Sequence, residues 1–274
     1  MPRQGPATYA PPRLGGAPIA QKIAGNTSGL KPNQIHTLER IYRRAISPSQ
    51  VISNELAQYL AVASREMRRQ IGVLVDRRGR IVHVVVGDTN KLDLPDLGRQ
   101  RAGRTRFRGL RLVHTHLQGE ALTRDDLTDL SLLQLDMVAV LQVDDGGRAS
   151  SIELAHLVPP GPTDALWDIR PPCPLHDFEL DFGVFIADLE GQFANYRKTQ
   201  TSGEGGMRAI AVHLATGAHG QPDPEESIAE LRELARTAGI ELVEVITQRR
   251  KKPDPRYVIG RGKLDQLLLA SMQR

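Results

Sequence analysis

The stretch IGVLVDRRGRIVHVVV, at residues 71–86, decides the fold of the first half of the chain. It contains two runs rich in β-branched residues, 71–75 and 80–86, with the polar sequence DRRG at 76–79 between them. Runs of this length around a short glycine-containing turn are typical of a β-hairpin. The sequence therefore predicts two antiparallel strands here.

Patterns on both sides of this hairpin predict an α/β domain over residues 31–160. Upstream, apolar residues at helical spacing predict a helix from Lys31 and a second helix around Ser49–Met67. Downstream, the sequence predicts strands at Gly109–His114, Met137–Val143 and Ser151–Leu157, and a helix at Arg124–Leu135. We therefore expect fold class α/β, with a mixed sheet in this N-terminal domain.

A second, smaller domain is predicted over residues 206–274. Met207–Leu214 and Glu241–Thr247 have strand patterns, and Pro224–Ala238 between them has a helical pattern. Because a helix separates the two strands, they are expected to pair in parallel, as a βαβ unit. A final helix is predicted from Leu264.

The remaining segments are predicted to connect or flank these domains. Residues 1–30 are rich in Pro and Gly and are expected to form a disordered tail. Residues 161–205, marked by proline clusters at 159–162 and 171–174, are expected to be a linker with one helix, at Phe182–Arg197.

Composition excludes several classes of protein. Hydrophobic residues make up 40% and charged residues 25%, as in ordinary globular proteins. No run approaches the length of a membrane span, and the N-terminus carries no apolar signal-peptide core, so we expect a cytoplasmic protein. The single cysteine excludes a disulfide framework and a cysteine-based zinc site within one chain.

Positive charge is concentrated in short segments, although the net charge is only +4. Residues 97–112 contain six arginines and no acid, and residues 249–263 contain seven cations and a single acid. Such clusters favour a polyanionic partner, most plausibly nucleic acid, and the alternative is a solvated loop. The predicted RNA-binding residues are Arg249, Arg250, Lys251, Lys252, Arg256, Arg261 and Lys263.

A possible metal site follows the strand that ends in Val-His-Thr-His. Alternate strand residues point to the same side, so His114 and His116 can converge on one ion, and Asp126 can supply a third ligand. The spacing resembles the His-x-His-x7-Ser-x-x-Asp motif of the JAMM (MPN) metalloproteases. Thr123 stands in place of the serine, Leu117 replaces the usual proline, and the spacing is one residue short.

The JAMM resemblance implies a zinc ion that activates water and an upstream glutamate that acts as general base. Glu66 is the only plausible upstream glutamate. Three interpretations stay open: a catalytically inactive relative whose histidines bond to neighbouring polar groups, a site that binds zinc without hydrolysis, and an active hydrolase.

The C-terminal domain resembles the N-terminal domain of the HflX family of ribosome-associated GTPases. The resemblance lies in RAIAV at 208–212, in Ser227–Ala238, and above all in RYVIGRGK at 256–263. Residues 36–195 resemble the extra N-terminal module of long HflX proteins. The family resemblance implies docking on the large ribosomal subunit and its rRNA, with GTP and Mg²⁺ as ligands of the intact protein.

The chain departs from that family because it contains no P-loop, the Gly-x-x-x-x-Gly-Lys-[Ser/Thr] motif that holds phosphates and Mg²⁺. Its one Gly-Lys pair, at 262–263, is followed by Leu264, and Tyr257 stands where the first glycine should be. We therefore expect a chain truncated before the GTPase domain, which does not hydrolyse GTP by itself. The predicted function is the ribosome- and RNA-binding portion of an HflX-like GTPase. The alternative is a zinc-dependent JAMM-like metallohydrolase that uses His114, His116 and Asp126.

Overall fold

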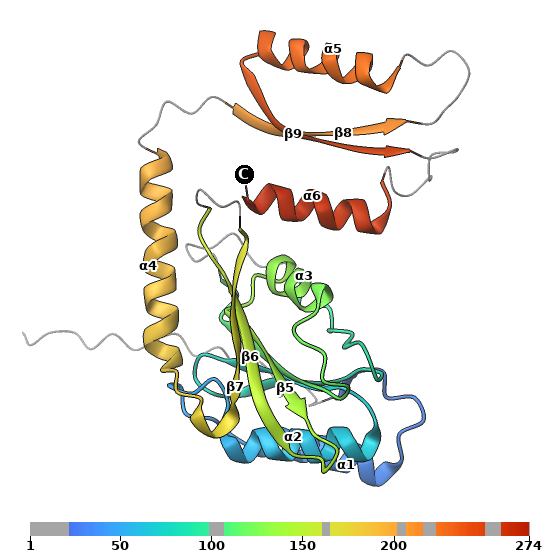
Figure 1. Ribbon diagram of the computed structural model, residues 1–274, viewed down its shortest axis with the longest axis vertical. Coiled ribbons are helices and arrows are strands. Elements are labelled where there is room, and N and C mark those ends of the chain that lie inside the picture. Colours follow the sequence, from blue (N-terminus) through green and yellow to red (C-terminus); the bar gives the residue numbers. More distant parts are fainter. Residues whose placement is uncertain are drawn as a thin grey trace, which may run out of the picture.

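The computed structural model describes residues 22–98, 107–160, 165–201, 207–215, 223–249 and 259–273. It is an α/β structure with one sheet of seven strands and a second sheet of two strands (Figure 1). The predicted fold class is confirmed. Among the helices of the described residues, none is long and apolar enough to cross a membrane.

The larger sheet has the strand order β1-β3-β2-β4-β5-β6-β7. The pairs β1–β3 and β4–β5 are parallel and the other pairs are antiparallel, so the sheet is mixed. Strands β2 and β3 form the hairpin that the sequence predicts at residues 71–86. The seven strands are β1 Ala24–Gly25, β2 Ile71–Asp76, β3 Ile81–Val86, β4 Leu110–His116, β5 Met137–Val143, β6 Ala149–Leu157 and β7 Trp167–Pro174.

Two helices and a helical turn that precede the hairpin, and one helix between β4 and β5, pack with this sheet. Helix α1 (Pro32–Glu39) continues into a 3-10 turn at Arg40–Arg43, and α2 spans Asn54–Met67. Helix α2 begins later than predicted because Ser53 caps it, its Oγ accepting a hydrogen bond from the Leu56 amide at 3.2 Å. Helix α2 contacts β2, β4, β5 and β6, whereas α3 (Arg124–Leu132) contacts β5 and β6. Figure 1 shows α1 and α2 below the sheet and α3 above it.

The predicted disordered tail, residues 1–30, differs in its described part. Residues 1–21 lie outside the described residues, but β1 pairs with Val85 and Val86 at the edge of the sheet. The Asn26 amide also donates to the Val86 carbonyl at 2.7 Å. Burial of Ile23, which is 7% exposed, provides an apolar anchor that the Pro/Gly-rich composition obscures.

The predicted linker, residues 161–205, also differs from expectation. Strand β7 pairs with β6, so the sheet extends past residue 160. Helix α4 (Phe182–Thr201) is the predicted linker helix, and it packs on the core of the larger sheet through one apolar face. That face consists of Phe182, Ile186, Leu189 and Phe193, all buried.

An ion-pair network holds α4 beside the β2–β3 turn. Arg77 in this turn donates to Asp136 at 2.6 and 3.1 Å and forms an ion pair with Glu190 of α4 at 2.9 Å. Burial raises the pKa of Asp136, and its contacts with Arg77 offset part of that rise. Helix α4 is therefore part of the first structural unit and not an independent connector.

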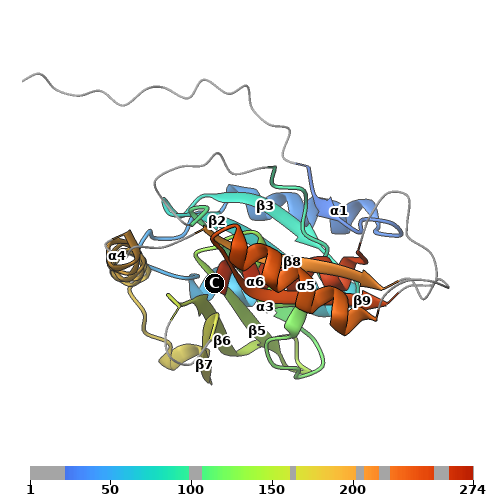
Figure 2. The same cartoon turned by 90° about the horizontal axis from the view of Figure 1, so that it is seen from above.

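The C-terminal segment forms the predicted βαβ unit. Strands β8 (Met207–Ala215) and β9 (Ile240–Arg249) are parallel, and α5 (Pro224–Thr237) connects them. Helix α6 (Arg261–Gln273) covers the opposite side of the two-stranded sheet from α5 (Figure 1). Helix α6 also contacts α3, and seen from above it lies over α3 (Figure 2).

Candidate metal centre

Strand β4 places the two predicted histidine ligands in the middle of the sheet. It pairs with β2 on one side and β5 on the other, and its register sets Gly72 and Val140 beside His114. Successive strand residues alternate between faces, so His114 and His116 lie on the same face. Their exposed fractions are 0% and 1%, and their ring centroids are 4.9 Å apart.

The third predicted ligand, Asp126, is fixed by the start of α3. Thr123 is the N-cap of this helix, and its amide and hydroxyl both donate to Asp126 Oδ2, at 2.8 and 2.7 Å. Burial favours the neutral acid, but contacts with His114 and these hydrogen bonds outweigh it and hold the pKa of Asp126 well below its usual range. Asp126 is therefore an anionic, rigidly held ligand.

The three side chains converge. Asp126 Oδ1 lies 3.2 Å from His114 Nε2, and Asp126 Oδ2 lies 3.6 Å from His116 Nε2. One ligand atom from each of the three residues can be chosen so that all lie within 4.8 Å of one another. The structure thus brings together all three residues of the predicted site.

Hydrogen bonding at the histidines agrees with metal ligation. His116 Nδ1 lies 2.9 Å from the Glu120 carbonyl oxygen, so Nδ1 carries the proton and the lone pair of Nε2 faces Asp126. Both ring nitrogens of His114 are buried without a hydrogen bond, because the close approach of Asp126 lacks hydrogen-bond geometry. Burial and the neighbouring His114 lower the pKa of His116, which favours the neutral, ligating form. This donor set fits a divalent ion such as zinc.

A cavity of about 320 Å³ opens beside Asp126. One residue that lines this cavity, Gln70, was not predicted from the sequence. Its side chain is 1% exposed, and its Nε2 atom has no hydrogen-bond partner. The predicted base, Glu66, does not line this cavity and is exposed on α2. The lining residues are Gln70, Asn90, Lys91, Leu92, Thr123, Arg124, Asp125, Asp126 and Asp129.

One further carboxyl group in this cavity has a shifted pKa. Burial, together with the negative charges of Asp126 and Asp125, raises the pKa of Asp129 to about 6. Asp125 itself forms an ion pair with Lys91 at 3.5 Å. The cavity therefore combines cationic, amide and carboxyl groups beside the three-residue cluster.

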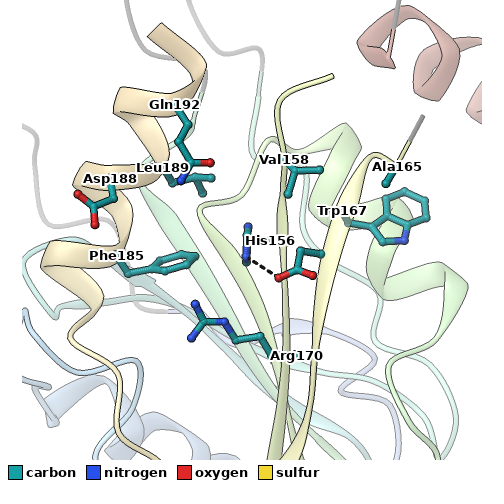
Figure 3. Close-up of a pocket in the computed structure, with 10 residues that line it drawn as sticks. His156, Val158, Ala165, Trp167, Arg170, Phe185, Asp188, Leu189 and Gln192 are labelled. Atoms are coloured by element: carbon teal, nitrogen blue, oxygen red, sulfur yellow. Dashed lines mark ion pairs between the residues drawn. The ribbon is translucent and has the colours of Figure 1, made fainter. Parts of the chain in front are cut away.

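A second cavity, of about 520 Å³, lies between α4 and the ends of β6 and β7 (Figure 3). Figure 3 shows Phe185 pointing from α4 toward His156, whose Nε2 forms an ion pair with Asp168 at 3.3 Å. His156 Nδ1 lies 3.0 Å from the Leu157 carbonyl oxygen, and Arg170 lies over the Phe185 ring. None of the three cluster residues lines it.

Comparison with known proteins concerns the C-terminal segment. Residues 225–274 match the family model described as GTP-binding GTPase N-terminal. GTPase HflX of Caldanaerobacter subterraneus subsp. tengcongensis is 42% identical over 60 residues, which are 22% of this chain and 13% of that relative. This segment, the HflX segment, resembles the N-terminal portion of HflX proteins. The chain thus spans only a small part of the curated HflX protein that it matches, and no solved structure matches it.

The HflX segment contains the predicted RNA-binding residues, and the structure describes only some of them. Arg249 is exposed at the end of β9, and Lys263 in the first turn of α6 donates to Gln266 Oε1 at 2.8 Å. Arg261 begins α6. The other four, Arg250, Lys251, Lys252 and Arg256, lie outside the described residues.

The arginine-rich segment at 97–112 is divided between two environments. Residues 99–106 lie outside the described residues. Arg108 donates to the carbonyls of Leu97, Gly98 and Leu133, and Arg111 is fully buried. These two arginines stabilise the fold, so they belong neither to a solvated loop nor to a phosphate-binding surface.

Proposed function

We propose that this chain is the N-terminal, ribosome- and RNA-binding portion of an HflX-like GTPase and that it docks on the large ribosomal subunit. The observation that carries the proposal is the HflX match over residues 225–274. In this proposal the protein works in the cytoplasm, and GTP and Mg²⁺ bind to a GTPase domain outside residues 1–274.

Charge supports this proposal. The seven cations of residues 249–263 fall within the HflX segment, between the end of β9 and the first turn of α6. Contacts between cations and phosphates provide much of the affinity for RNA and make it dependent on salt. We therefore propose that these residues contact rRNA.

Co-sedimentation with large ribosomal subunits at two salt concentrations tests this function. The triple variant Lys251→Ala, Lys252→Ala, Arg256→Ala should weaken binding by about tenfold or more at low salt and should flatten its salt dependence. A control with the same change of charge replaces Arg43, Arg78 and Arg148, which are exposed in the larger domain. Equal binding of both variants would exclude the proposed contact, and a wild-type chain that fails to co-sediment would exclude docking altogether.

A second function is favoured by a separate observation, the convergence of three buried ligand atoms within 4.8 Å. We propose that His114, His116 and Asp126 bind a divalent metal ion, zinc being the expected one. Two histidines and one carboxylate are the three protein ligands of many open zinc sites. A zinc ion held there would act as a Lewis acid at its fourth coordination position.

Neighbouring groups of the chain orient two of the three proposed ligands by hydrogen bonds. Thr123 orients Asp126, and the Glu120 carbonyl orients His116. We do not propose Glu66 as the general base of a JAMM-like metallohydrolase, because it is exposed on α2 and does not line the cavity. The proposed activity is therefore metal binding, and hydrolysis would need another base.

Metal analysis tests this second function. The purified protein, dialysed against zinc and then against buffer, should retain one zinc per chain, and His116→Ala should lose it. His176→Ala is a matched control, because His176 is an exposed histidine that also lies near a carboxylate, 3.4 Å from Asp177. Substoichiometric zinc in the wild type, or full occupancy in His116→Ala, would contradict the assignment.

A further inference from the structure

We propose that Gln70 is the positioning residue of this centre, and that its side-chain amide donates a hydrogen bond to a carboxylate ligand at the metal's open position. The inference rests on the proposed metal binding by His114, His116 and Asp126. It adds the chemical class of the ligand, a monoanionic carboxylate, and the residue that selects it.

The register of the sheet places Gln70 beside the cluster. Gly72 of β2 lies opposite His114 of the antiparallel strand β4. Gln70 directly precedes β2, and the same register brings it level with His116. Its backbone continues the ladder between β2 and β3 by bonding to Asp88 and Gly87. Residues opposite one another in an antiparallel pair share a face, so Gln70 lies on the face of the two histidines.

Gly72 has no side chain, which leaves space on the sheet face that carries the two histidines. A Cβ atom at position 72 would come within 2.5 Å of Leu92 Cδ2 and 3.1 Å of His114 Cβ. The absence of a side chain at Gly72 therefore leaves room for Leu92, which lines the cavity, to pack beside His114.

The Gln70 amide lacks the partner that its burial requires. Its Nε2 atom is buried without a hydrogen bond, and Gln70 lines the same cavity as Asp126. An unsatisfied buried donor is unfavourable, so such groups normally face an ordered water or a ligand acceptor. An oxygen atom bound at the metal would satisfy Gln70 and complete the coordination left open by three protein ligands.

Charge and size favour a carboxylate. Lys91, Arg124 and a divalent ion together carry one more positive charge than the aspartates Asp125, Asp126 and Asp129. A monoanion therefore neutralises the cavity, whose volume of about 320 Å³ exceeds that of a water molecule and accommodates a small organic acid or a chain end. Gln70, being an amide, donates to this anion and cannot take up a proton as a glutamate would.

The test uses the full chain loaded with Co²⁺, whose visible absorption reports both metal uptake and ligand binding. Acetate is titrated as a free carboxylate, and N-acetyl-dialanine and its C-terminal amide are titrated as a peptide end with and without the carboxylate. Gln70→Leu removes the donor at similar volume, Gln70→Glu replaces it with an anion, and Gln192→Leu is the control at an exposed amide on α4. Circular dichroism checks that each variant is folded.

We expect Gln70→Leu to weaken acetate binding by about tenfold, the effect of one charge-assisted hydrogen bond, while Co²⁺ affinity stays within about threefold of wild type. Gln70→Glu should abolish acetate binding, and Gln192→Leu should change nothing. Stronger binding of the peptide acid than of acetate would identify a chain end as the source of the carboxylate. Unchanged acetate affinity in Gln70→Leu, or loss of Co²⁺ from it, would overturn the role of Gln70. A wild-type chain that takes up no Co²⁺ would instead overturn the metal centre, and the inference with it.

Discussion

The guanidinium of Arg111 lies 4.3 Å from the centre of the Phe182 ring, and both side chains are buried. Arg111 belongs to β4 and Phe182 begins α4, so this contact joins the helix to the strand that carries the two histidines. Arg111 also donates to the carbonyls of Val51 and Asp76, at 2.9 and 2.8 Å. Burial lowers its pKa to about 10, which still leaves it charged at neutral pH.

Arg111→Ala should therefore lower the free energy of unfolding by about 3 kcal/mol, because it leaves a cavity and removes two hydrogen bonds to backbone carbonyls, of which only that of Asp76 keeps another donor, the Gly79 amide. Urea denaturation measures the loss. Arg78→Ala, at an exposed turn position, should change stability by less than about 0.5 kcal/mol. Similar stabilities for the two variants would show that the buried arginine does not hold α4 in place.

Two glycines should respond oppositely to alanine. At Gly72 the new methyl group has no room beside Leu92 and His114, so Gly72→Ala should destabilise the protein by about 2 kcal/mol and weaken metal binding. At Gly191, inside α4, the added Cβ meets no atom within 4 Å beyond its chain neighbours and the helix's own backbone, and alanine should stabilise the helix by about 0.5–1 kcal/mol. Thermal unfolding of both variants, with zinc titration of the first, measures these effects. A Gly72→Ala protein as stable as Gly191→Ala would refute the crowding argument.

Asp129 should make stability depend on pH. Its folded pKa, about 6, lies above the ordinary value of 3.8, so its contribution is present below pH 3.8 and is lost as the pH rises through 6. Replacing the carboxyl by an amide removes that loss. The advantage of Asp129→Asn over wild type should grow by about 1 kcal/mol between pH 5 and pH 7.5, after allowance for partial exposure.

Urea denaturation at the two pH values provides the measurement. Asp93→Asn, at an exposed position, should show the same difference from wild type at both. If Asp129→Asn behaved in the same way, Asp129 would have an ordinary pKa.

Zinc should stabilise the protein, because the ligands come from β4 and α3, which meet only in the native fold. At a zinc concentration about 100 times Kd, linkage predicts a gain of about 2.7 kcal/mol, or roughly 5–10 °C in Tm. Chelation should reverse the shift, and differential scanning calorimetry can follow both. His114→Ala should melt at the same temperature with and without zinc, and a shift that survives in this variant would place the bound zinc elsewhere.

The elements that the sequence predicts well are those with local signals. The hairpin at 71–86 and the final βαβ unit follow from periodicity within short windows, and β5 was predicted at Met137–Val143, its observed bounds. Strand β7 was missed because three prolines obscure its pattern, and β1 because it has only two residues. In both cases pairing with a distant strand decides the structure.

The candidate metal centre shows the same limit. His114, His116 and Asp126 could be found because alternation in a strand and capping of a helix are local. Gln70 could not, because its place beside them depends on the register of β2 against β4, set by paired residues 34 to 42 positions apart. The burial of Arg111 inside an arginine-rich run was equally invisible, since charge alone indicates a solvated or phosphate-binding surface.

The prolines of β7 limit the pairing of the large sheet with strands of other molecules. Pro171, Pro172 and Pro174 have no amide hydrogen, so the last strand of the large sheet offers few donors to an incoming strand. At the opposite end of the sheet, β1 is too short to template one. The small sheet differs, since β8 and β9 pair only with each other among the described strands and each leaves one long side free. Intermolecular strand addition, including aggregation at high concentration, should therefore begin at the C-terminal unit.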